Sequence, residues 1–396
     1  MKAQITCLIL VLTLSAPACG RSQQTIKIER SPGIGGVAVP VELQPEWAGA
    51  EEGVQVTGDG GDDVVFQEAP ALFQAGTDSS EDAYCAILPS DFSRGRVQED
   101  SDVNPAFSLH EEDGRLRLLD GEQPVFAYNY GKQLREGVPE RYRRSTYVHP
   151  IWDLSGTVIT DDFPDDHYHH RGLSWMWPRV KVGDKTYSLW HLQGVQQIFQ
   201  EWMARDVGPV CATIGVRNAW QLSGGREIID ERVWIRAYRA TDAGRAIDMR
   251  LTLEATEDTV QLMGKKTKNK GYGGVSLRLG PREETIITTS EGVQSEDSNH
   301  KRVPWADESG MFRGASQFSG AALFQHAGNP DFPAQWTLRH YGFLGVAWPG
   351  NDGTTLAPGE TVTLRYRLWV HGGNAEAGRV SRAYEAFTNP PAAQIP

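Results

Sequence analysis

One stretch, residues 141–178, holds most of the side chains in this sequence that could do chemistry. It reads RYRRSTYVHPIWDLSGTVITDDFPDDHYHHRGLSWMWP and contains four of the ten histidines, five aspartates, four arginines and three tryptophans. Charged groups and imidazoles are costly to bury unless they are paired or used in a site. The stretch is therefore predicted to form the wall of a polar pocket.

The densest part of this stretch is Asp166–Gly172, DHYHHRG. If the segment is extended, His167, His169 and Arg171 share one face, while His170 lies on the other. A histidine here is predicted to act as a general acid or base, with a neighbouring aspartate setting its tautomer and arginines binding an oxyanion. A purely structural role, with the imidazoles bonded to nearby aspartates or backbone, is the alternative.

A divalent metal ion is a possible cofactor of the same residues. His167 and His169 would supply two ligands, and His149, Asp153 or His340 would supply the third. The HxH pattern is common and does not identify a metal site by itself. The sequence therefore requires no cofactor, and if a metal is bound we expect His167, His169 and His149 to hold it.

Two further segments add candidates. Alternation along residues 143–150 places Tyr147 and His149 on one face, either a solvated sheet face or the floor of a polar cleft. The segment KGYGGVSLR, residues 270–278, couples a lysine and a tyrosine around a glycine turn, and a plain hairpin explains it equally well. The candidate catalytic residues are His149, His167, His169, His170, Lys270 and Tyr272, and the candidate substrate-binding residues are Arg144, Tyr147, Arg171, Trp175, Arg278 and His340.

The composition argues against several classes of protein. The net charge is −12, and no Lys/Arg tract offers a nucleic-acid footprint. The four cysteines include no CxxC pair, which argues against a zinc ribbon or a redox motif. Cys85 and Cys211 remain once Cys7 and Cys19 are set aside, and two buried free thiols are favoured over a bridge between them.

Residues 1–19, MKAQITCLILVLTLSAPAC, are predicted to be a signal peptide, because a short apolar run follows a lysine and precedes small residues. Cleavage after Ala18 and lipidation of Cys19 are equally good interpretations. Both place the mature chain outside the cytoplasm, as a periplasmic protein or a membrane-anchored lipoprotein of a bacterium. A lipid at Cys19 would be the chain's only contact with the membrane.

The pattern along the chain predicts an all-β fold. The sequence has 42 glycines and 22 prolines, and period-two alternation recurs between turn signals. Helical periodicity is confined to Gln193–Met203 and Val380–Phe387. The strands predicted from alternation are Arg115–Leu119, Glu231–Tyr238, Ala246–Leu253 and Thr361–Val370.

Two domains are predicted after the signal peptide. Residues 20–106 form a small β-sandwich-like domain, with joins at Thr77–Asp82 and Val97–Asn104. Residues 107–390 form one large antiparallel β-sandwich that carries the site, and the closing segment resembles that of mutarotase-like sugar-processing sandwiches. The predicted strands of the small domain are Val37–Leu43, Val54–Val56, Val64–Gln67 and Tyr84–Leu88.

The motifs RRSTYVHPIWDLSGTVITDDFPDDHYHHRGLSWMW, KGYGGVSLR and GNPDFPAQWTLRHYG resemble a bacterial family of secreted proteins labelled "methane oxygenase PmoA", over most of residues 107–390. The resemblance implies a β-sandwich protein of carbohydrate breakdown. It does not imply methane chemistry at a membrane, because no apolar span follows residues 1–19. Within the family pattern the site would comprise His149, the histidines of 167–170, Arg171 and Lys270, with Tyr272 and Arg278 beside them.

The sequence therefore predicts a secreted enzyme that acts on a glycoside or keto-sugar as a hydrolase, lyase or epimerase. A non-catalytic sugar-binding lipoprotein is the alternative, and a metal-dependent oxygenase, which the family label suggests, is the third. Removal of a proton next to a carbonyl suits an imidazole and a cation better than it suits paired carboxylates. The carboxylates of Asp165 and Asp166 leave the glycosidase route open.

Overall fold

The structure of the chain is a computed structural model. It describes residues 25–29, 38–43, 54–58, 63–73, 82–89, 94–98, 105–390 and 392–394. The predicted signal peptide lies outside the described residues, and so does most of the two predicted joins, Thr77–Asp82 and Val97–Asn104.

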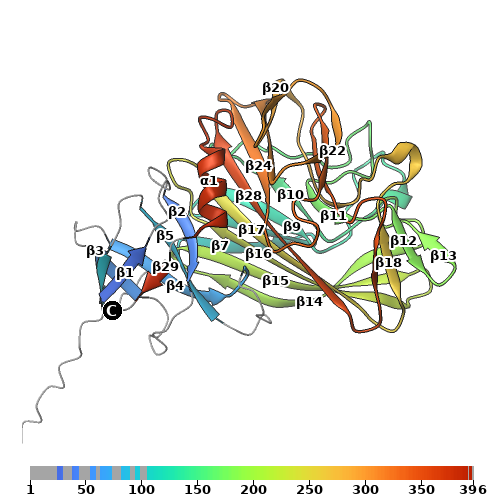
Figure 1. The fold of residues 1–396 in the computed structure, drawn as a ribbon, viewed down its shortest axis with the longest axis horizontal. Helices are drawn as coiled ribbons and strands as arrows, with labels where there is room; N and C mark the ends of the chain where they lie inside the picture. The colour runs from blue at the N-terminus through green and yellow to red at the C-terminus, as the bar shows by residue number, and fades with distance from the viewer. Residues whose placement is uncertain are drawn as a thin grey trace, which may run out of the picture.

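The prediction of an all-β fold is confirmed, because large antiparallel sheets make up most of the described chain (Figure 1). The first large sheet has nine strands in the spatial order β22 (Ser298–Arg302), β25 (Gln335–Arg339), β26 (Phe343–Ala347), β19 (Gly274–Arg278), β11 (Leu173–Met176), β10 (Tyr147–Ile151), β9 (Gln123–Asn129), β8 (Arg115–Asp120) and β7 (Phe107–Glu112).

The second large sheet also has nine strands, and a smaller sheet of four strands lies beside it. The order in the second sheet is β14 (Val195–Val207), β15 (Cys211–Leu222), β16 (Glu227–Tyr238), β17 (Arg245–Ala255), β28 (Thr361–Gly372), β24 (Ser319–Gln325), β23 (Trp305–Phe312), β20 (Arg282–Thr289) and β21 (Gly292–Gln294). The small sheet has the order β13 (Lys185–Tyr187), β12 (Arg179–Val182), β18 (Val260–Met263) and β27 (Thr354–Leu356).

The two large sheets share one hydrophobic core. Trp175 and Leu277 come from the first sheet, and Ile214, Val233 and Leu251 come from the second, all of them buried. Because successive strand residues face opposite sides, alternating sequence places one apolar row of each strand in this core. The four strands predicted from alternation over residues 115–370 all lie in these two sheets.

One of the two helix predictions is wrong. Gln193–Met203 is not a helix, since it belongs to β14, which pairs with β15 along nearly its whole length. Hydrogen bonds and side-chain packing with a neighbouring strand outweigh a weak helical periodicity in the sequence. The other is confirmed as α1 (Val380–Thr388), which buries Val380, Ala383 and Phe387. In the described part of the chain, no helix has the length and hydropathy needed to cross a membrane.

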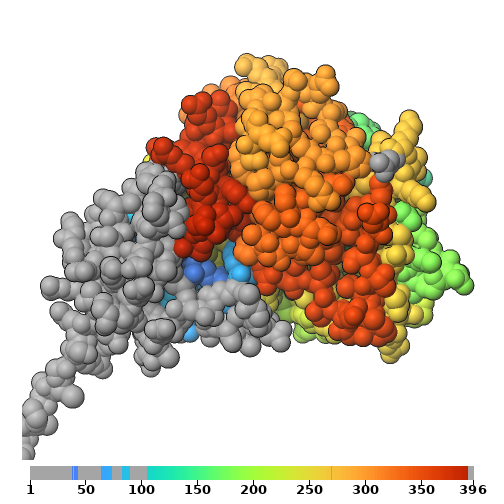
Figure 2. Space-filling model, in the orientation of Figure 1, coloured from blue at the N-terminus to red at the C-terminus, as the bar shows by residue number. Residues whose placement is uncertain are grey.

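A seven-stranded sheet near the N-terminus lies against the second large sheet and α1 (Figure 1). In Figure 2 the red C-terminal residues lie beside blue residues of this sheet. One edge strand of this sheet comes from the C-terminal end of the chain and pairs with the strand nearest the N-terminus. The order is β2 (Val39–Leu43), β5 (Asp82–Leu88), β4 (Asp63–Pro70), β3 (Val54–Gly58), β6 (Arg94–Gln98), β1 (Thr25–Glu29) and β29 (Ala392–Gln394).

Arg236 of β16 joins the N-terminal sheet to the large sandwich. Its fully buried guanidinium donates to Glu42 Oε2 at 2.9 Å and to Cys85 Sγ at 3.0 Å. Cys85 and Cys211 are both buried free thiols, as the composition predicted. A buried cation held by partners on another sheet fixes the relative position of the two sheets.

Candidate functional site

The histidine-rich segment forms two consecutive tight turns and is not extended, so the shared face of His167, His169 and Arg171 that an extended segment would give does not form. The His167 backbone N–H donates to Pro164 O at 3.0 Å, and the His170 N–H donates to His167 O at 2.8 Å. Proline and aspartate favour turns over ladder pairing, and Pro164 and Asp165 precede His167 here. A turn brings residues three apart together, so the His167 and His170 rings stack 4.6 Å apart with an interplanar angle of 5°.

These turns form one wall of a cavity of about 260 Å³, which we call the histidine cavity. Its other walls come from the segment after β13, from the turn before β19, and from β25, β26 and the loop between them. The residues that line it are His167, His169, His170, Trp190, His191, Lys270, Tyr272, Thr337, Arg339, Tyr341 and Phe343.

Four imidazoles meet in this cavity. The His169 ring lies 4.6 Å from the ring of His170 and 4.6 Å from that of His191, in both cases edge to face. His170 packs on Phe343 at 5.0 Å, and His167 packs on Tyr341 at 5.5 Å. Aromatic packing on two sides holds the imidazoles in fixed orientations.

Burial is the main reason that the pKa values of three histidines in this cluster are lowered. Burial, together with the charges of neighbouring histidines and arginines, lowers the pKa of His169 to about 3 and the pKa of His170 well below its ordinary value. Burial also lowers the pKa of His191, with help from Lys265 and Arg144. These three imidazoles are therefore neutral at pH 7, and each can donate one hydrogen bond and accept one.

His167 differs from the other three histidines of the cavity because it has a carboxylate neighbour. Its Nδ1 lies 2.9 Å from Asp166 Oδ2, while Asp166 Oδ1 accepts a hydrogen bond from Arg278 at 3.0 Å. Burial by itself would raise the pKa of Asp166, but the contact with His167 and the charge of Arg278 outweigh it, and the pKa is lowered. The ionised carboxylate favours a proton on Nδ1, which leaves Nε2 to act on a substrate.

Several buried polar atoms in the cavity wall have no hydrogen-bond partner in the described part of the chain. They are His167 Nδ1, His170 Nδ1, Trp190 Nε1 and Thr337 Oγ1, the first of which lies near Asp166 Oδ2 without the geometry of a hydrogen bond. An unpaired buried polar atom costs about 1–3 kcal/mol, and such atoms in native proteins are normally satisfied by water or by a ligand. These atoms are available to pair with a polar ligand that enters the cavity.

Beneath the cavity, Arg171 holds the histidine turns in place. Its guanidinium donates to the backbone oxygens of Tyr168, His170 and Tyr142, each at 2.7 Å. It also lies 3.2 Å from Asp162 Oδ1 and 3.5 Å from the centre of the Phe163 ring. With a side chain only 1% exposed, Arg171 does not reach a ligand and instead fixes the loop that carries the histidines.

Two more sequence candidates, Tyr147 and Arg144, lie beside Arg171, outside the cavity lining. The Tyr147 hydroxyl donates to Asp162 Oδ2 at 2.8 Å and is fully buried. Arg144 is buried against Met176 Sδ and the Leu189 carbonyl. Only part of the expected alternating row is a strand, because β10 begins at Tyr147. The expectation of a polar cleft floor there is wrong, since these groups are paired inside the protein.

The remaining sequence candidates are also placed away from the lining. His149 Nδ1 lies 2.9 Å from Thr160 Oγ1. Trp175 is fully buried in the core between the sheets, so it cannot stack on a sugar. His340 contacts Asp297 and the Gln294 carbonyl, and Arg278 reaches the site through Asp166 and through the Tyr341 ring, 4.7 Å away.

Five of the predicted catalytic residues do come together in the cavity, namely His167, His169, His170, Lys270 and Tyr272. Sequence reasoning missed six lining residues. A polar group at Arg339–Gly342 was visible in the sequence, whereas the pair Trp190–His191 stands in an ordinary turn sequence with no signal of its own. The missed residues are Trp190, His191, Thr337, Arg339, Tyr341 and Phe343.

The metal hypothesis does not fit this geometry. His149, the expected third ligand, contacts Thr160 and is not among the residues that line the cavity. Among the described residues, no group of three or more His, Cys, Asp or Glu side chains is arranged to hold a metal ion. Closely packed neutral imidazoles remain suited to hydrogen bonding and proton transfer.

The buried histidines predict that the protein loses stability as the pH falls below about 6.5. Burial lowers the pKa of His149 and of His169 to about 3, from an ordinary value of 6.5. Between these pH values the unfolded chain binds more protons than the folded one. This contribution to the free energy of unfolding is therefore greatest above pH 6.5 and decreases towards pH 3. Urea midpoints at pH 7.5 and pH 5 measure this difference.

The carboxyl group of Asp162 changes the stability with pH in the opposite direction. Burial raises the pKa of Asp162 from 3.8 to about 6, so this carboxyl loses stabilisation as the pH rises through that window. His149, His169 and His170 outnumber it. His149→Asn should reduce the slope between pH 5 and 7.5, whereas His110→Gln, on the exposed side of β7, controls for the loss of a histidine as such. Equal urea midpoints at the two pH values would contradict the expected slope.

The fold and the site define a class of protein: a large antiparallel double-sheet protein with a histidine-lined cavity formed by its loops and sheet edge. The chain belongs to DUF6807, a family of unknown function, whose model matches residues 115–385. The resemblance to a family labelled "methane oxygenase PmoA" is corrected by this match, because the matching family is named for no activity. The oxygenase alternative, which rested on that label, has no remaining basis.

Solved structures similar to this chain include carbohydrate-active enzymes, and no curated protein sequence matches it. An alpha-mannosidase from Enterococcus faecalis V583 is 11% identical over 94% of this chain and 46% of its own length, with a TM-score of 0.42. A GH36 alpha-galactosidase from Geobacillus stearothermophilus is 12% identical over 68% of this chain and 41% of its own length, with a TM-score of 0.33. A galactose 1-epimerase from Lactobacillus acidophilus NCFM is 10% identical over 69% of this chain and 100% of its own length, with a TM-score of 0.28.

This chain thus spans less than half the length of the first two enzymes. These similarities describe the β architecture and assign no activity. A fold of this kind hosts many activities, so the function depends on the residues of the site.

Proposed function

We propose that this protein is an enzyme that acts on a carbohydrate or keto-sugar by histidine acid/base chemistry in the histidine cavity. The observation that carries the proposal is His167, whose Nδ1 lies 2.9 Å from Asp166 Oδ2 in a cavity that it shares with three other imidazoles. A base oriented by a carboxylate, beside a space for a substrate, is the arrangement that general acid/base catalysis needs.

The lining of the cavity suits a sugar. Trp190, Tyr272 and Phe343 supply flat apolar faces, and the Trp190 and Tyr272 rings lie 4.9 Å apart. Between these faces stand hydroxyl, imidazole and indole groups that can pair with sugar hydroxyls. Pockets that bind small molecules combine apolar walls with a few placed polar groups in this way.

Two cations and the neutral imidazoles favour one class of reaction. Lys270 and Arg339 bring positive charge to the lining, where it can stabilise a developing enolate oxygen, although the Arg339 guanidinium also donates to Ser298 O and Asn299 Oδ1 and lies 3.9 Å from Asp297 Oδ2. A neutral imidazole can donate a hydrogen bond to the same oxygen. His167 would then remove the proton next to the carbonyl, as in a lyase or an epimerase.

Hydrolysis by paired carboxylates is less well supported. A glycosidase of that type places two Asp or Glu side chains on either side of the scissile bond. Among the described residues that line the cavity, none is Asp or Glu. Asp166 contacts His167 and Arg278, where it can orient the base.

The test is solvent exchange and turnover with a panel of keto-sugars and keto-glycosides in D₂O. Wild-type protein should incorporate deuterium next to the carbonyl of its substrate, and His167→Gln should lower that rate by about 10²- to 10⁴-fold. His110→Gln, an exposed histidine on β7, is the matched control and should be unaffected. Sugar binding without exchange or turnover in the wild type would contradict the proposal and identify a sugar-binding protein instead.

We also propose that the mature chain works outside the cytoplasm, since residues 1–19 have the pattern of a signal peptide. Expression of the full chain in a bacterium should place it outside the cytoplasm, and removal of residues 2–19 should retain it inside. Fractionation of wild type and Cys19→Ser separates the two cleavage interpretations, because only a lipidated Cys19 would hold the wild type on the membrane. Equal cytoplasmic retention of the full and shortened chains would overturn the proposal.

A further inference from the structure

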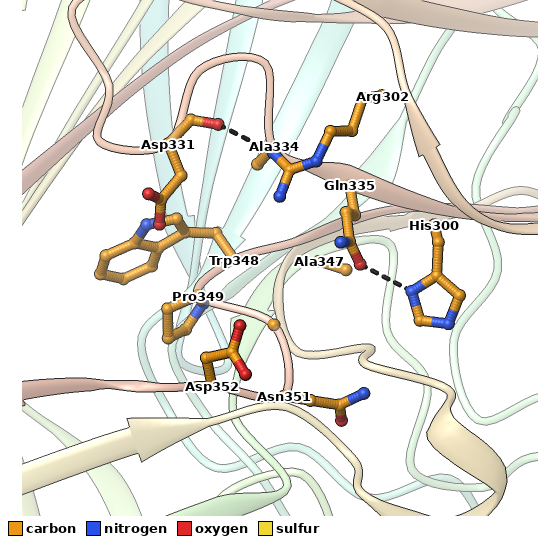
Figure 3. A pocket seen from close by; sticks show the side chains of 11 residues that line it. His300, Arg302, Asp331, Ala334, Gln335, Ala347, Trp348, Pro349, Asn351 and Asp352 are labelled. Carbon is orange, nitrogen blue, oxygen red and sulfur yellow. Dashed lines mark hydrogen bonds between the residues drawn. The ribbon is translucent and has the colours of Figure 1, made fainter.

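A second cavity, drawn in Figure 3, is lined in part by strand β25, which also lines the histidine cavity. Its volume is also about 260 Å³. Its walls come from β22, from the chain that leads into β25, and from the end of β26 with the turn after it. The side chains that matter here are His300, Arg302, Gln335, Trp348, Asn351 and Asp352.

Strand β25 runs along both cavities. Gln335 lines the second cavity, while Thr337 and Arg339 line the histidine cavity. Residues at i, i+2 and i+4 of a strand project from the same face, about 7 Å apart along the strand. One row of side chains therefore passes from one cavity into the other.

The turn at residues 270–272 stands between the two cavities. Lys270 and Tyr272 line the histidine cavity, whereas a Cβ on Gly271 would lie 3.3 Å from His300 Cε1 and 3.7 Å from Gln335 Oε1, two residues that line the second cavity. Gly271 has φ +69°, a conformation that favours glycine. The backbone of this turn therefore lies close to side chains of both cavities.

The same loop is fixed to the wall of the second cavity. The Gly264 N–H donates to Gly350 O at 2.6 Å, and the Lys265 N–H donates to Tyr272 O at 2.9 Å. Gly350 itself lines the second cavity. The backbone that presents Lys270 to the histidine cavity is therefore held by the rim of its neighbour.

The chemistry of the second cavity suits hydroxyl groups. His300 Nδ1 lies 2.6 Å from Gln335 Oε1, and Arg302 donates to the backbone oxygens of Asp331 and Pro333 at 3.4 and 2.9 Å. The Trp348 side chain is 2% exposed, and its Nε1 has no hydrogen-bond partner in the described part of the chain. Figure 3 shows the Arg302 guanidinium, the carboxylates of Asp331 and Asp352 and the amides of Gln335 and Asn351 around the cavity, so acceptors outnumber the one guanidinium.

We infer that the second cavity is a subsite for a further sugar residue of the substrate whose reacting residue occupies the histidine cavity. The inference rests on the proposed function and narrows its substrate class to glycosides of at least two sugar residues. Two carboxylates against one guanidinium disfavour a phosphate or carboxylate ligand, whereas sugar hydroxyls can donate to the carboxylates and amides and accept from the guanidinium. The two cavities would then hold two sugar residues of one glycoside.

The test compares one-residue and two-residue ligands by isothermal titration and by turnover. The probes are the methyl glycosides of glucose, galactose and mannose, the disaccharides of the same sugars, and the keto forms of both sets. The variant is Arg302→Ala/Asp352→Ala, in which both truncated side chains are exposed, so that folding is preserved. Asp184→Ala, an exposed aspartate in the turn between β12 and β13, is the matched control.

The variant is expected to weaken binding of the preferred two-residue ligand, or to raise its KM, at least tenfold while leaving kcat and the one-residue ligand unchanged. Equal effects on both ligands, or on neither, overturn the subsite even if His167→Gln abolishes turnover. Selective loss of two-residue binding without any turnover in the wild type supports the subsite and overturns the proposed catalysis. Absence of binding by every probe overturns both.

Discussion

Asp166→Asn should lower kcat by about 10²- to 10⁴-fold and change KM little, because Asp166 acts through His167. Its Oδ2 lies 2.9 Å from His167 Nδ1, and its Oδ1 accepts from Arg278 at 3.0 Å. An amide at this position can present its N–H₂ to the imidazole, which would favour a proton on Nε2, the wrong nitrogen for a base. Asp166 is thus a positioning residue.

The sequence offers a control one residue away. Asp165 is 86% exposed and pairs with Arg135 on the surface, so Asp165→Asn makes the same chemical change without contact with His167. This control should retain wild-type kcat. The split between kcat and KM provides the second readout, since loss of a positioning contact lowers kcat and leaves KM nearly unchanged, whereas loss of a binding contact raises KM. An Asp166→Asn variant with wild-type kcat would remove His167 from its proposed role.

Arg171→Met is expected to lower the free energy of unfolding by about 3–5 kcal/mol, the usual cost of breaking a buried ion pair from one side. It would leave Asp162 buried without its cation and free the carbonyls of Tyr142, Tyr168 and His170. Arg171→Lys should lose nearly as much, because an ammonium cannot reproduce the planar fork that reaches three carbonyls. Chemical denaturation measures both variants.

Arg143→Met is the matched control for this loss. Arg143 lies 28 positions earlier (171 − 143) and pairs with Glu140, with a side chain 41% exposed. Exposed pairs contribute at most about 1 kcal/mol, so this variant should lie close to the wild type. An Arg171→Lys variant as stable as the wild type would show that the buried guanidinium does not hold the histidine turns.

Local pattern in the sequence was sufficient for much of the fold. Alternation with period two is a property of each strand by itself, and it placed the strands of β8, β16, β17 and β28 correctly. It failed at β14, whose identity depends on pairing with β15. The C-terminal strand β29 could not be anticipated, since three residues carry no period and its partner β1 lies at the other end of the chain.

The candidate site, like the fold, was only partly predictable from the sequence. The sequence by itself determined that His167, His169, His170, Lys270 and Tyr272 are present and crowded with charge, and residue type and spacing were enough for that. Only the tertiary structure decided their partners: Arg278 reaches Asp166, and Tyr341 stacks on His167, across sequence separations of more than a hundred residues.

The tertiary structure also decided which side chains are buried. Arg171 could be read as a ligand-binding cation, and it is instead enclosed by backbone carbonyls and the Phe163 ring. Trp190 and His191 gave no signal in the sequence, yet they complete the cavity. Whether a side chain lines a cavity or fills the interior depends on which distant strands pack around it, and the pattern of one segment does not contain that information.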